Sequence, residues 1–198
     1  MVIVDYGVGN LFSLKSSFAF IGQEVTVSGD RDVIAKADRI ILPGVGAFAD
    51  AAEKLRKSGL DQVIIEETAK GKPLLGICLG MQMLFEKSYE FGETEGLGLI
   101  PGTVELMTPP DLLIPQIGWN KLEMNEKHKL MEGLDDDTYV YFVHSFAAVC
   151  DGSNVASYTD YGGRVPACVF NGNVCGCQFH PEKSGEAGLQ IIRNFAAM

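Results

Sequence analysis

The chain is organised around Lys72-Pro-Leu-Leu-Gly-Ile-Cys78-Leu-Gly-Met-Gln-Met-Leu-Phe85, where a short apolar run is followed at once by a longer one. The first run, 74–77, is typical of a strand buried on both faces of a parallel sheet. The second run, 79–85, contains no breaker, and its apolar spacings are tolerated by a helix. The sequence therefore predicts a strand that passes directly into a helix, with Cys78 at the junction.

Glycine stands two residues away from the cysteine on each side, at Gly76 and Gly80. In a tight strand-to-helix turn, such glycines let neighbouring backbone approach closely while the central side chain is pushed outward, as in a nucleophile elbow. A thiol there also lies at a helix N-terminus, where partial positive charge favours the reactive thiolate. The alternative is that Cys78 is a small buried hydrophobic residue, so a nucleophile requires a partner.

The candidate partner lies in Val174-Cys-Gly-Cys-Gln-Phe-His180-Pro-Glu182-Lys-Ser184. An apolar strand leads to the histidine, and Pro181 prevents the backbone from turning directly into a helix there. We expect His180 to take the thiol proton and Glu182 to hold the imidazole in one tautomer and stabilise its charged form. Alone, His-Pro-Glu is typical of a hydrogen-bonding cluster at a loop end. Together with the elbow, it predicts a Cys-His-Glu triad.

The composition is that of an ordinary globular chain of 198 residues, 46% hydrophobic and 21% charged, for which we expect a single domain over 1–198. The balance of 16 basic against 26 acidic residues argues against a surface for nucleic acid or anionic membranes. No charged leader and no apolar run of membrane-spanning length is present, so we expect a cytoplasmic protein. The five cysteines lack the spacing of a secreted scaffold, which predicts reduced thiols.

Strands alternate with helices in the first half of the chain, which predicts an α/β fold. Such a fold is an open, mostly parallel sheet flanked by helices on both faces, with sites at the carboxyl ends of its strands. After Gly102, short strands separated by turns predict an antiparallel excursion on the same sheet. The expected strands are 2–4, 24–28, 39–42, 74–77, 103–106, 115–118, 121–124, 139–143, 154–158 and 167–170. The expected helices are 11–21, 33–37, 47–58, 61–70, 79–85 and 186–197, and 88–98 is expected to be a loop.

Two motifs taken together, Gly76-Ile-Cys78-Leu-Gly80-Met-Gln82 and Gln178-Phe-His180-Pro-Glu182, resemble the class I, or triad, glutamine amidotransferases. The triad of that family hydrolyses the side-chain amide of glutamine. Further segments resemble one branch, the glutaminase subunits of imidazole glycerol phosphate synthases in histidine biosynthesis. These segments are Asp5-Tyr-Gly-Val-Gly-Asn10, Pro43-Gly-Val-Gly-Ala-Phe48, Ile117-Gly-Trp-Asn120, Tyr141-Phe-Val-His-Ser-Phe146 and His180-Pro-Glu-Lys-Ser184.

The resemblance also implies roles for individual residues. The Val45 and Leu79 amides would form the oxyanion hole, although a plain glycine-rich turn is the alternative for 43–46. Glu90 would hold the α-amino group of glutamine; its alternative is a solvated loop acid. Family members often have tyrosine in place of Phe146, a difference of little effect if the contact is made by backbone. The full set implied to bind glutamine is Gly46, Gln82, Glu90, Ser145 and Phe146.

A partner protein is expected, because ammonia is useful only if it reaches a second active site before it is lost. The resemblance implies a (β/α)₈-barrel cyclase subunit in a heterodimer, which uses the ammonia to form imidazole glycerol phosphate and releases aminoimidazole carboxamide ribonucleotide. No metal or organic cofactor is expected. The implied interface residues are Asn10, Trp119, Tyr141 and Lys183, and Trp119 could equally belong to the core.

Three local alternatives remain. Two glycines in 5–10 suggest a dinucleotide-binding loop, but the third glycine of that fingerprint is missing. His144 is a rival base without a neighbouring carboxylate. Cys175 and Cys177 share one face of a strand near His180, yet no fourth ligand for a metal is apparent.

Three alternative functions also remain. The first is the glutaminase subunit of another synthase, of the anthranilate or aminodeoxychorismate type. The second is an enzyme resembling γ-glutamyl hydrolase, which would accept extended γ-glutamyl substrates. The third is a non-catalytic regulatory module with a decayed site, against which the intact Cys78, His180 and Glu182 count.

Overall fold

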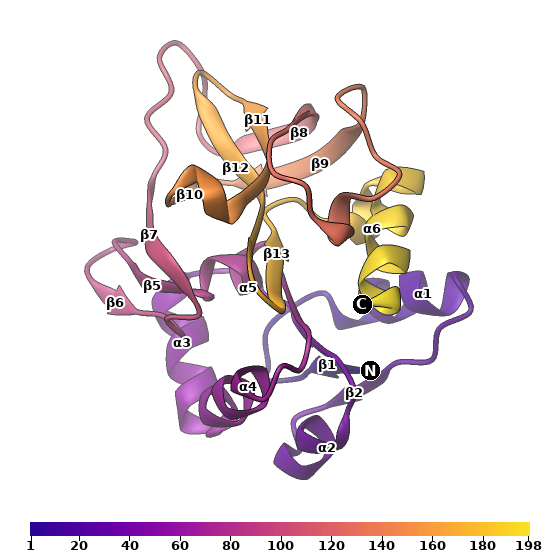
Figure 1. Ribbon diagram of the computed structural model, residues 1–198. Coiled ribbons are helices and arrows are strands. Elements are labelled where there is room, and N and C mark those ends of the chain that lie inside the picture. The colour runs from indigo at the N-terminus through magenta and orange to yellow at the C-terminus, as the bar shows by residue number, and fades with distance from the viewer.

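The computed structural model describes residues 1–198, which form a nine-stranded main sheet and a four-stranded second sheet (Figure 1). Five neighbouring strands of the main sheet run parallel, and the pairings beyond them are antiparallel. In spatial order the strands are β2 (Thr26–Ser28), β1 (Val2–Val4), β3 (Ile40–Leu42), β4 (Leu74–Ile77), β13 (Val174–Cys177), β12 (Arg164–Asn171), β11 (Val155–Asp160), β8 (Gln116–Met124) and β9 (Tyr139–His144). The parallel and antiparallel halves meet at β13, which pairs parallel with β4 and antiparallel with β12; we call it the seam strand.

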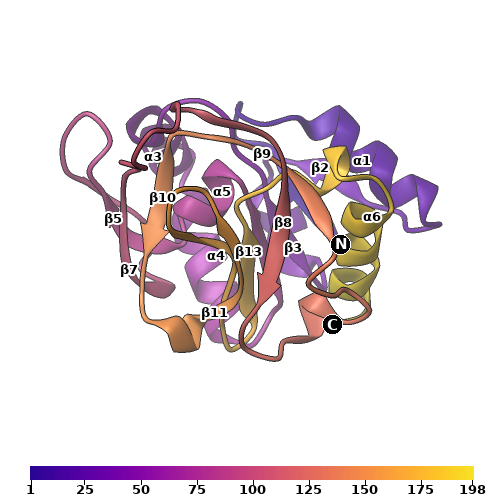
Figure 2. The ribbon, with the colours of Figure 1, turned by 90° about the horizontal axis from the view of Figure 1, so that it is seen from above.

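Helices cover the parallel half of the main sheet on both faces (Figures 1 and 2). One face is covered by α1 (Leu11–Phe20) and α6 (Gly185–Ala197). The other is covered by α2 (Arg31–Lys36), α3 (Phe48–Lys57) and α4 (Leu60–Ala69). None of the helices is long and apolar enough to cross a lipid bilayer.

Successive residues of the central strands face opposite sides of the sheet. Val2 and Val4 belong to a core cluster of 25 buried residues beneath α2, α3 and α4. Ile3 points the other way, into a cluster of 22 buried residues beneath α1 and α6. A strand with a core on each face needs apolar side chains at every position, which explains the continuous apolar runs in the sequence.

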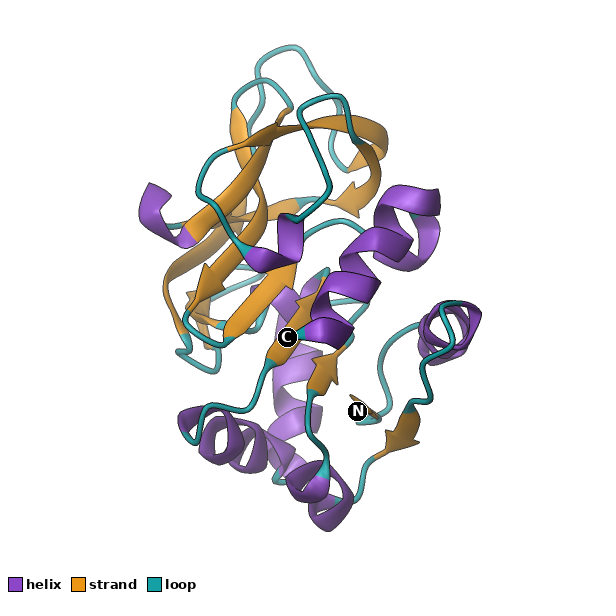
Figure 3. Cartoon of the chain, turned by 45° about the vertical axis from the view of Figure 1, so that its right-hand side comes forward, coloured by secondary structure: helices purple, strands orange, loops and turns teal.

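The second sheet lies beside the main sheet, on the side opposite α1 and α6 (Figure 2). Its strands, in spatial order, are β10 (Phe146–Val149), β7 (Ile100–Leu106), β5 (Phe85–Ser88) and β6 (Thr94–Glu95). Three single turns of 3₁₀ helix complete the fold: η1 (Lys129–Met131), η2 (Gly152–Asn154) and η3 (Pro181–Lys183). Figure 3 shows the strands of the antiparallel half at one end of the molecule and most of the helices at the other.

The expected α/β class with helices on both faces is confirmed, and the antiparallel part is larger than an excursion. The helix expected over 79–85 was wrong in length: α5 (Leu79–Gln82) is a single turn, and the chain then enters β5. Every residue of 79–85 is buried, and a fully buried run does not distinguish helix from strand by its periodicity. The loop expected over 88–98 was also wrong at Ser88 of β5 and at β6, whose polar residues carry no apolar pattern and form a strand by backbone pairing with β5. The break expected after Gly118 is absent, because β8 pairs continuously with β9 there.

Candidate active site

Gly76 and Gly80 make the junction between β4 and α5 possible. A Cβ atom added at Gly76 would lie 2.7 Å from the carbonyl oxygen of Gly80. One added at Gly80 would collide with the carbonyl oxygen of Leu42 in the neighbouring strand β3. The expectation that both glycines serve close backbone approach is therefore confirmed. They hold Cys78 in a turn that no bulkier pair of residues would allow.

Cys78 has a backbone conformation that is rare for a residue with a side chain, with φ 54° and ψ −112°. Such left-handed geometry costs free energy and persists only where surrounding structure fixes it. Here the Cys78 amide donates to the Cys177 carbonyl oxygen at 2.8 Å. Because α5 has only four residues, its dipole is weaker than the sequence suggested, and the activation of the thiol has to come from neighbouring side chains.

His180 follows the end of β13, the strand next to the one that leads to Cys78. Its Nδ1 donates to Glu182 Oε1 at 2.8 Å, and both side chains are almost completely buried. Pro181 opens the 3₁₀ turn η3, so the carboxylate returns beneath the imidazole two residues later. This hydrogen bond keeps a proton on Nδ1 and so fixes the imidazole tautomer. Nε2 is left to exchange a proton with the sulfur of Cys78.

The pKa of His180 is raised from 6.5 to about 9. Burial alone would lower this pKa, but hydrogen bonds to Cys78 and Glu182, together with their negative charges, outweigh the burial. His180 therefore carries a proton at neutral pH. An imidazolium beside a cysteine stabilises the thiolate, which is the attacking form of the side chain.

Cys78 and His180 open into a cavity of about 440 Å³. Both residues expected to form the oxyanion hole and all five expected to bind glutamine also line this cavity, although they come from distant parts of the chain. Glu182 lies behind the imidazole and does not line it. The full lining is Val45, Gly46, Cys78, Leu79, Gln82, Glu90, Phe91, Pro115, Val143, His144, Ser145, Phe146, His180 and Lys183.

The loop of Val45 and Gly46 forms one wall of the cavity. Gly46 has φ +94°, a value that favours glycine, and the Val45 side chain is 44% exposed. The buried Tyr6 hydroxyl donates to the carbonyl oxygen of Pro43 at 2.7 Å and so fixes the start of the loop. Tyr6 has a positioning role that the sequence did not reveal, because it lies in a different loop.

Glu90 also lines the cavity and is held there by the start of α3. Its Oε2 accepts a hydrogen bond of 2.7 Å from the amide of Phe48, the first residue of α3. The carboxylate therefore caps a helix whose own N-cap residue, Ala47, has no side chain able to do so. Glu90 is thus not the solvated loop acid of the alternative, since it is held beside the cavity.

Gln82 is held more firmly than the sequence suggests. Its Nε2 donates to the Phe146 carbonyl oxygen at 2.8 Å and to Gln178 Oε1 at 3.0 Å, which uses both of its N–H groups. Only its Oε1 remains free for a ligand. Gln82 can therefore accept a hydrogen bond from a bound molecule but has no hydrogen left to donate.

His144 lines the same cavity but is unsuited to act as the base. Its Nδ1 donates to the Phe146 carbonyl oxygen at 2.8 Å. Burial lowers its pKa to about 4, the backbone hydrogen bond opposes this, and the charge of His180 adds to the lowering. The imidazole of His144 is therefore neutral at physiological pH. The pKa values of the two histidines lie on opposite sides of neutrality because only His180 faces anionic partners.

Three of the four expected interface residues form one cluster. The rings of Trp119 and Tyr141 meet edge to face with centroids 6.1 Å apart, and Lys183 Nζ lies 5.8 Å from the Tyr141 ring centroid. Trp119 is 52% exposed, so it does not belong to the core. Asn10 is separate: its side chain accepts from the Ser13 amide at 3.4 Å and caps α1.

Cys175 and Cys177 are fully buried in β13, and their thiols contact backbone carbonyl oxygens of β4. No group of three or more histidine, cysteine or carboxylate side chains is arranged to hold a metal. The cysteines of β13 are therefore packing residues.

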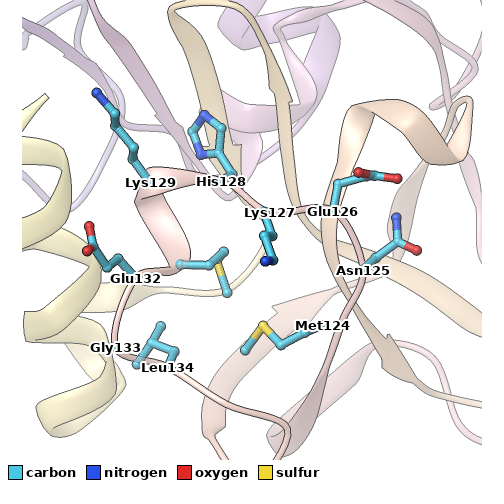
Figure 4. A pocket seen from close by; sticks show the side chains of 10 residues that line it. Met124, Asn125, Glu126, Lys127, His128, Lys129, Glu132, Gly133 and Leu134 are labelled. Atoms are coloured by element: carbon cyan, nitrogen blue, oxygen red, sulfur yellow. The ribbon is translucent and has the colours of Figure 1, made fainter.

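A second cavity, of about 520 Å³, lies beside η1 and is lined by residues 124–129 and 131–134 (Figure 4). Its His128 ring stacks on Phe170 with centroids 4.5 Å apart, and Lys129 points away from the hollow. The lining contains no cysteine and no oxyanion loop. It lacks the parts of a nucleophilic site that the cavity at Cys78 contains.

The comparisons with known proteins agree with this geometry. Residues 2–198 match the family described as glutamine amidotransferase class-I. A Lactococcus lactis protein named imidazole glycerol phosphate synthase subunit HisH is 48% identical over 98% of this chain and 96% of its own length. A Bacillus cereus protein of the same name is 48% identical over 98% of this chain and 93% of its own length.

Solved structures agree in fold. A structure described as a glutamine amidotransferase superposes with a TM-score of 0.78 at 21% identity, covering 99% of this chain and 97% of that one. The structure of PurLQS from Thermotoga maritima superposes with a TM-score of 0.79 at 23% identity, covering 99% and 96%. With the elbow, the buried histidine–glutamate pair and the family match over 2–198, the chain belongs to the class-I glutamine amidotransferases.

Proposed function

We propose that this chain is the glutaminase subunit of an imidazole glycerol phosphate synthase and that it hydrolyses L-glutamine to L-glutamate and ammonia. The observation that carries the proposal is the cavity in which Cys78 faces a protonated His180 backed by Glu182 at 2.8 Å. The two relatives at 48% identity, both named as HisH subunits of that synthase, support the specific function.

The first half of the reaction consumes the amide. The Cys78 thiolate attacks the side-chain carbonyl carbon of glutamine and forms a tetrahedral intermediate whose oxygen carries the negative charge. The imidazolium of His180 then gives its Nε2 proton to the departing nitrogen, which leaves as ammonia. The C–N bond breaks as the carbonyl re-forms, and a thioester remains on Cys78.

The second half releases glutamate. Neutral His180 removes a proton from a water molecule, and the resulting hydroxide attacks the thioester carbon. Collapse of the second tetrahedral intermediate breaks the C–S bond and restores the thiolate and the imidazolium. Glu182 remains ionised throughout and stabilises the imidazole each time it becomes charged.

The negative oxygen of both intermediates needs donors at one wall of the cavity. We assign the backbone amides of Val45 and Leu79 to this role, because both residues line the cavity beside Cys78. Leu79 is the first residue of α5, so its amide has no partner in the preceding turn. Gly46 lets the loop turn at a positive φ beside the reacting carbon.

The remaining cavity residues hold the amino-acid end of glutamine. Glu90 is the anionic group positioned for the α-ammonium. Gln82 Oε1 is a second acceptor for an N–H group, because Gln82 Nε2 is already occupied. Backbone groups of Ser145 and Phe146 are assigned to the α-carboxylate. The Phe146 contact does not depend on the ring, so phenylalanine serves there as well as tyrosine.

We propose a (β/α)₈-barrel cyclase subunit as the partner that receives the ammonia. The face of β8 and β9 that carries Trp119 and Tyr141 also carries Val143, because alternate residues of a strand share a face. Val143 and Lys183 line the cavity, so this surface continues directly into the site. Asn10, the N-cap residue of α1, is assigned to the same interface. A partner on this face would lie at the mouth of the cavity.

We also propose that the protein acts in the cytoplasm and that residues 1–198 form one domain. A nucleophilic thiol and four further unpaired cysteines suit a reducing compartment. The two large core clusters lie on opposite faces of one sheet, which favours cooperative folding of the whole chain.

The test is glutamate release from glutamine by the purified chain, alone and with the cyclase subunit and its ribonucleotide ligand. We expect weak activity alone and strong stimulation in the complex. Cys78→Ala should abolish release, whereas Cys150→Ala, which changes the only cysteine that is not buried, should leave it intact. Activity that ignores the cyclase would refute the assigned synthase, and activity retained by Cys78→Ala would refute the triad.

A further inference from the structure

Four groups form a continuous hydrogen-bonded chain that ends on the sulfur of Cys78. The Phe146 carbonyl oxygen accepts from Gln82 Nε2 at 2.8 Å, and the same nitrogen donates to Gln178 Oε1 at 3.0 Å. Gln178 Nε2 then lies 3.8 Å from Cys78 Sγ, within the range of a hydrogen bond to sulfur. Three separate segments, β10, α5 and the end of β13, are joined by this chain.

The direction of each hydrogen bond follows from the carbonyl at the start. A carbonyl oxygen can only accept, so Gln82 has to turn its amide nitrogen toward Phe146. The second hydrogen of that nitrogen then faces Gln178 and requires an acceptor there, which orients Gln178 with its oxygen toward Gln82. The amide nitrogen of Gln178 is left facing the sulfur. Cys78 therefore meets a donor whichever protonation state it has.

Burial makes this arrangement rigid. The Gln178 side chain is completely buried and that of Gln82 is 5% exposed, so water is not a ready substitute for either partner. The Phe146 carbonyl oxygen also accepts from His144 Nδ1 at 2.8 Å, which occupies its second lone pair. A flip of either amide would place like groups against each other at a buried contact.

The donor has a chemical effect on the sulfur. Cys78 Sγ lies 4.0 Å from the Val143 carbonyl oxygen, a group that a thiol could donate to but that repels a thiolate. Gln178 Nε2 acts in the opposite sense, because a donor stabilises the anionic form of its acceptor. Gln178 does not line the cavity, so it leaves the space in front of the sulfur free for a ligand.

We propose that Gln178 is a catalytic residue that donates to the Cys78 sulfur, stabilises its thiolate and holds it facing the cavity, with Gln82 as the residue that positions Gln178. This inference rests on the proposed role of Cys78 as the nucleophile. It assigns to Gln82 a task at the reacting sulfur in addition to its task at the substrate.

The test is the pH dependence of Cys78 alkylation by iodoacetamide without glutamine, measured by peptide mass spectrometry. In Gln178→Met, which keeps the length but removes the donor, we expect the apparent midpoint to rise by about one pH unit, the size of a charge-assisted hydrogen bond. Gln178→Glu keeps the acceptor for Gln82 and should raise the midpoint at least as far. Gln82→Met should raise it less. Burial raises the pKa of Cys150 to about 11, so that thiol serves as a slow internal reference.

Gln116→Met is the matched control, since Gln116 is an equally buried strand glutamine that contacts Asn120 and not the sulfur. Its midpoint should equal that of the parent, and thermal unfolding should show all compared variants to be folded. Folded Gln178→Met and Gln178→Glu proteins with the parent's midpoint would overturn the proposal. A parent chain whose Cys78 is no more reactive than Cys150 would instead refute the proposed function itself.

Discussion

The substitution Glu182→Gln isolates the contribution of the carboxylate to the charge of His180. Glutamine has nearly the same shape, and its oxygen can still accept from Nδ1, where Glu182 Oε1 now accepts at 2.8 Å. The negative charge is lost. A hydrogen bond to a charged group contributes about 1.5–3 kcal/mol and a neutral one about 1 kcal/mol, so the imidazolium loses about 0.5–2 kcal/mol. The pKa of His180 should then fall from about 9 by about one pH unit.

The assay is an NMR titration of the imidazoles, which is tractable because the chain has only 3 histidines. In the parent, His180 should titrate near 9 and His144 near 4, and burial together with Lys129 keeps the pKa of His128 below its usual value. In Glu182→Gln, only His180 should move substantially, and turnover should fall roughly 10- to 100-fold.

A matched control is Glu67→Gln, which removes another largely buried carboxylate, one paired with Lys70 and Lys72 far from the site. This control should leave the His180 titration unchanged. If Glu182→Gln also left it unchanged, the carboxylate would not be the source of the raised pKa, and the reasoning about the triad would be refuted.

Three further predictions concern folding and assembly. Gly80→Ala should destabilise the chain by about 3 kcal/mol or more in urea unfolding, because the added Cβ would meet the Leu42 carbonyl oxygen. Gly152→Ala is the control: its Cβ meets only a tyrosine hydroxyl, so the free energy of unfolding should change little. The pKa of His180 is raised on folding, so the protonated imidazole should stabilise the folded chain fully below about pH 6.5 and no longer do so once the pH has risen through about 9. A difference in unfolding free energy between the parent and His180→Asn that instead grew with pH would contradict this direction. Trp119→Ala should weaken cyclase binding by about 2 kcal/mol in calorimetry, as loss of an exposed aromatic anchor does, and unchanged affinity would remove this residue from the interface.

The sequence was informative where a short local pattern is compatible with only one backbone conformation. The junction at Cys78 needs two glycines at fixed positions, because the backbone of Leu42 leaves no room for a side chain at Gly80. Likewise, Pro181 between His180 and Glu182 permits only a short turn that brings the carboxylate back to the ring. Both patterns lie within a few residues, so the elbow and the histidine–glutamate pair could each be predicted from the sequence, whereas the pairing of β4 with β13 that brings them together is tertiary.

The sequence was less informative where tertiary packing decides. The apolar run after Cys78 fits a helix or a strand equally well. After the single helical turn α5, the chain pairs with β7 and becomes strand β5 of the second sheet. The hydrogen bonding of the Gln178 side chain was also invisible, since its partners Gln82 and Cys78 lie in a segment far away in the chain. The signal that could have found it is position: a polar residue directly after a fully buried strand and two places before His180 needs a partner.

The site lies where the two halves of the sheet meet, and this placement bears on how a partner could influence it. The parallel half supplies Cys78 at the end of β4, and the seam strand β13 leads to His180. The antiparallel half supplies Val143 at the end of β9, whose other exposed positions carry the proposed partner surface. The His180 amide also donates to the Tyr141 carbonyl oxygen at 3.0 Å. A partner that shifts β9 by contact with Tyr141 would therefore move both a wall of the cavity and the backbone that holds the histidine, without touching Cys78.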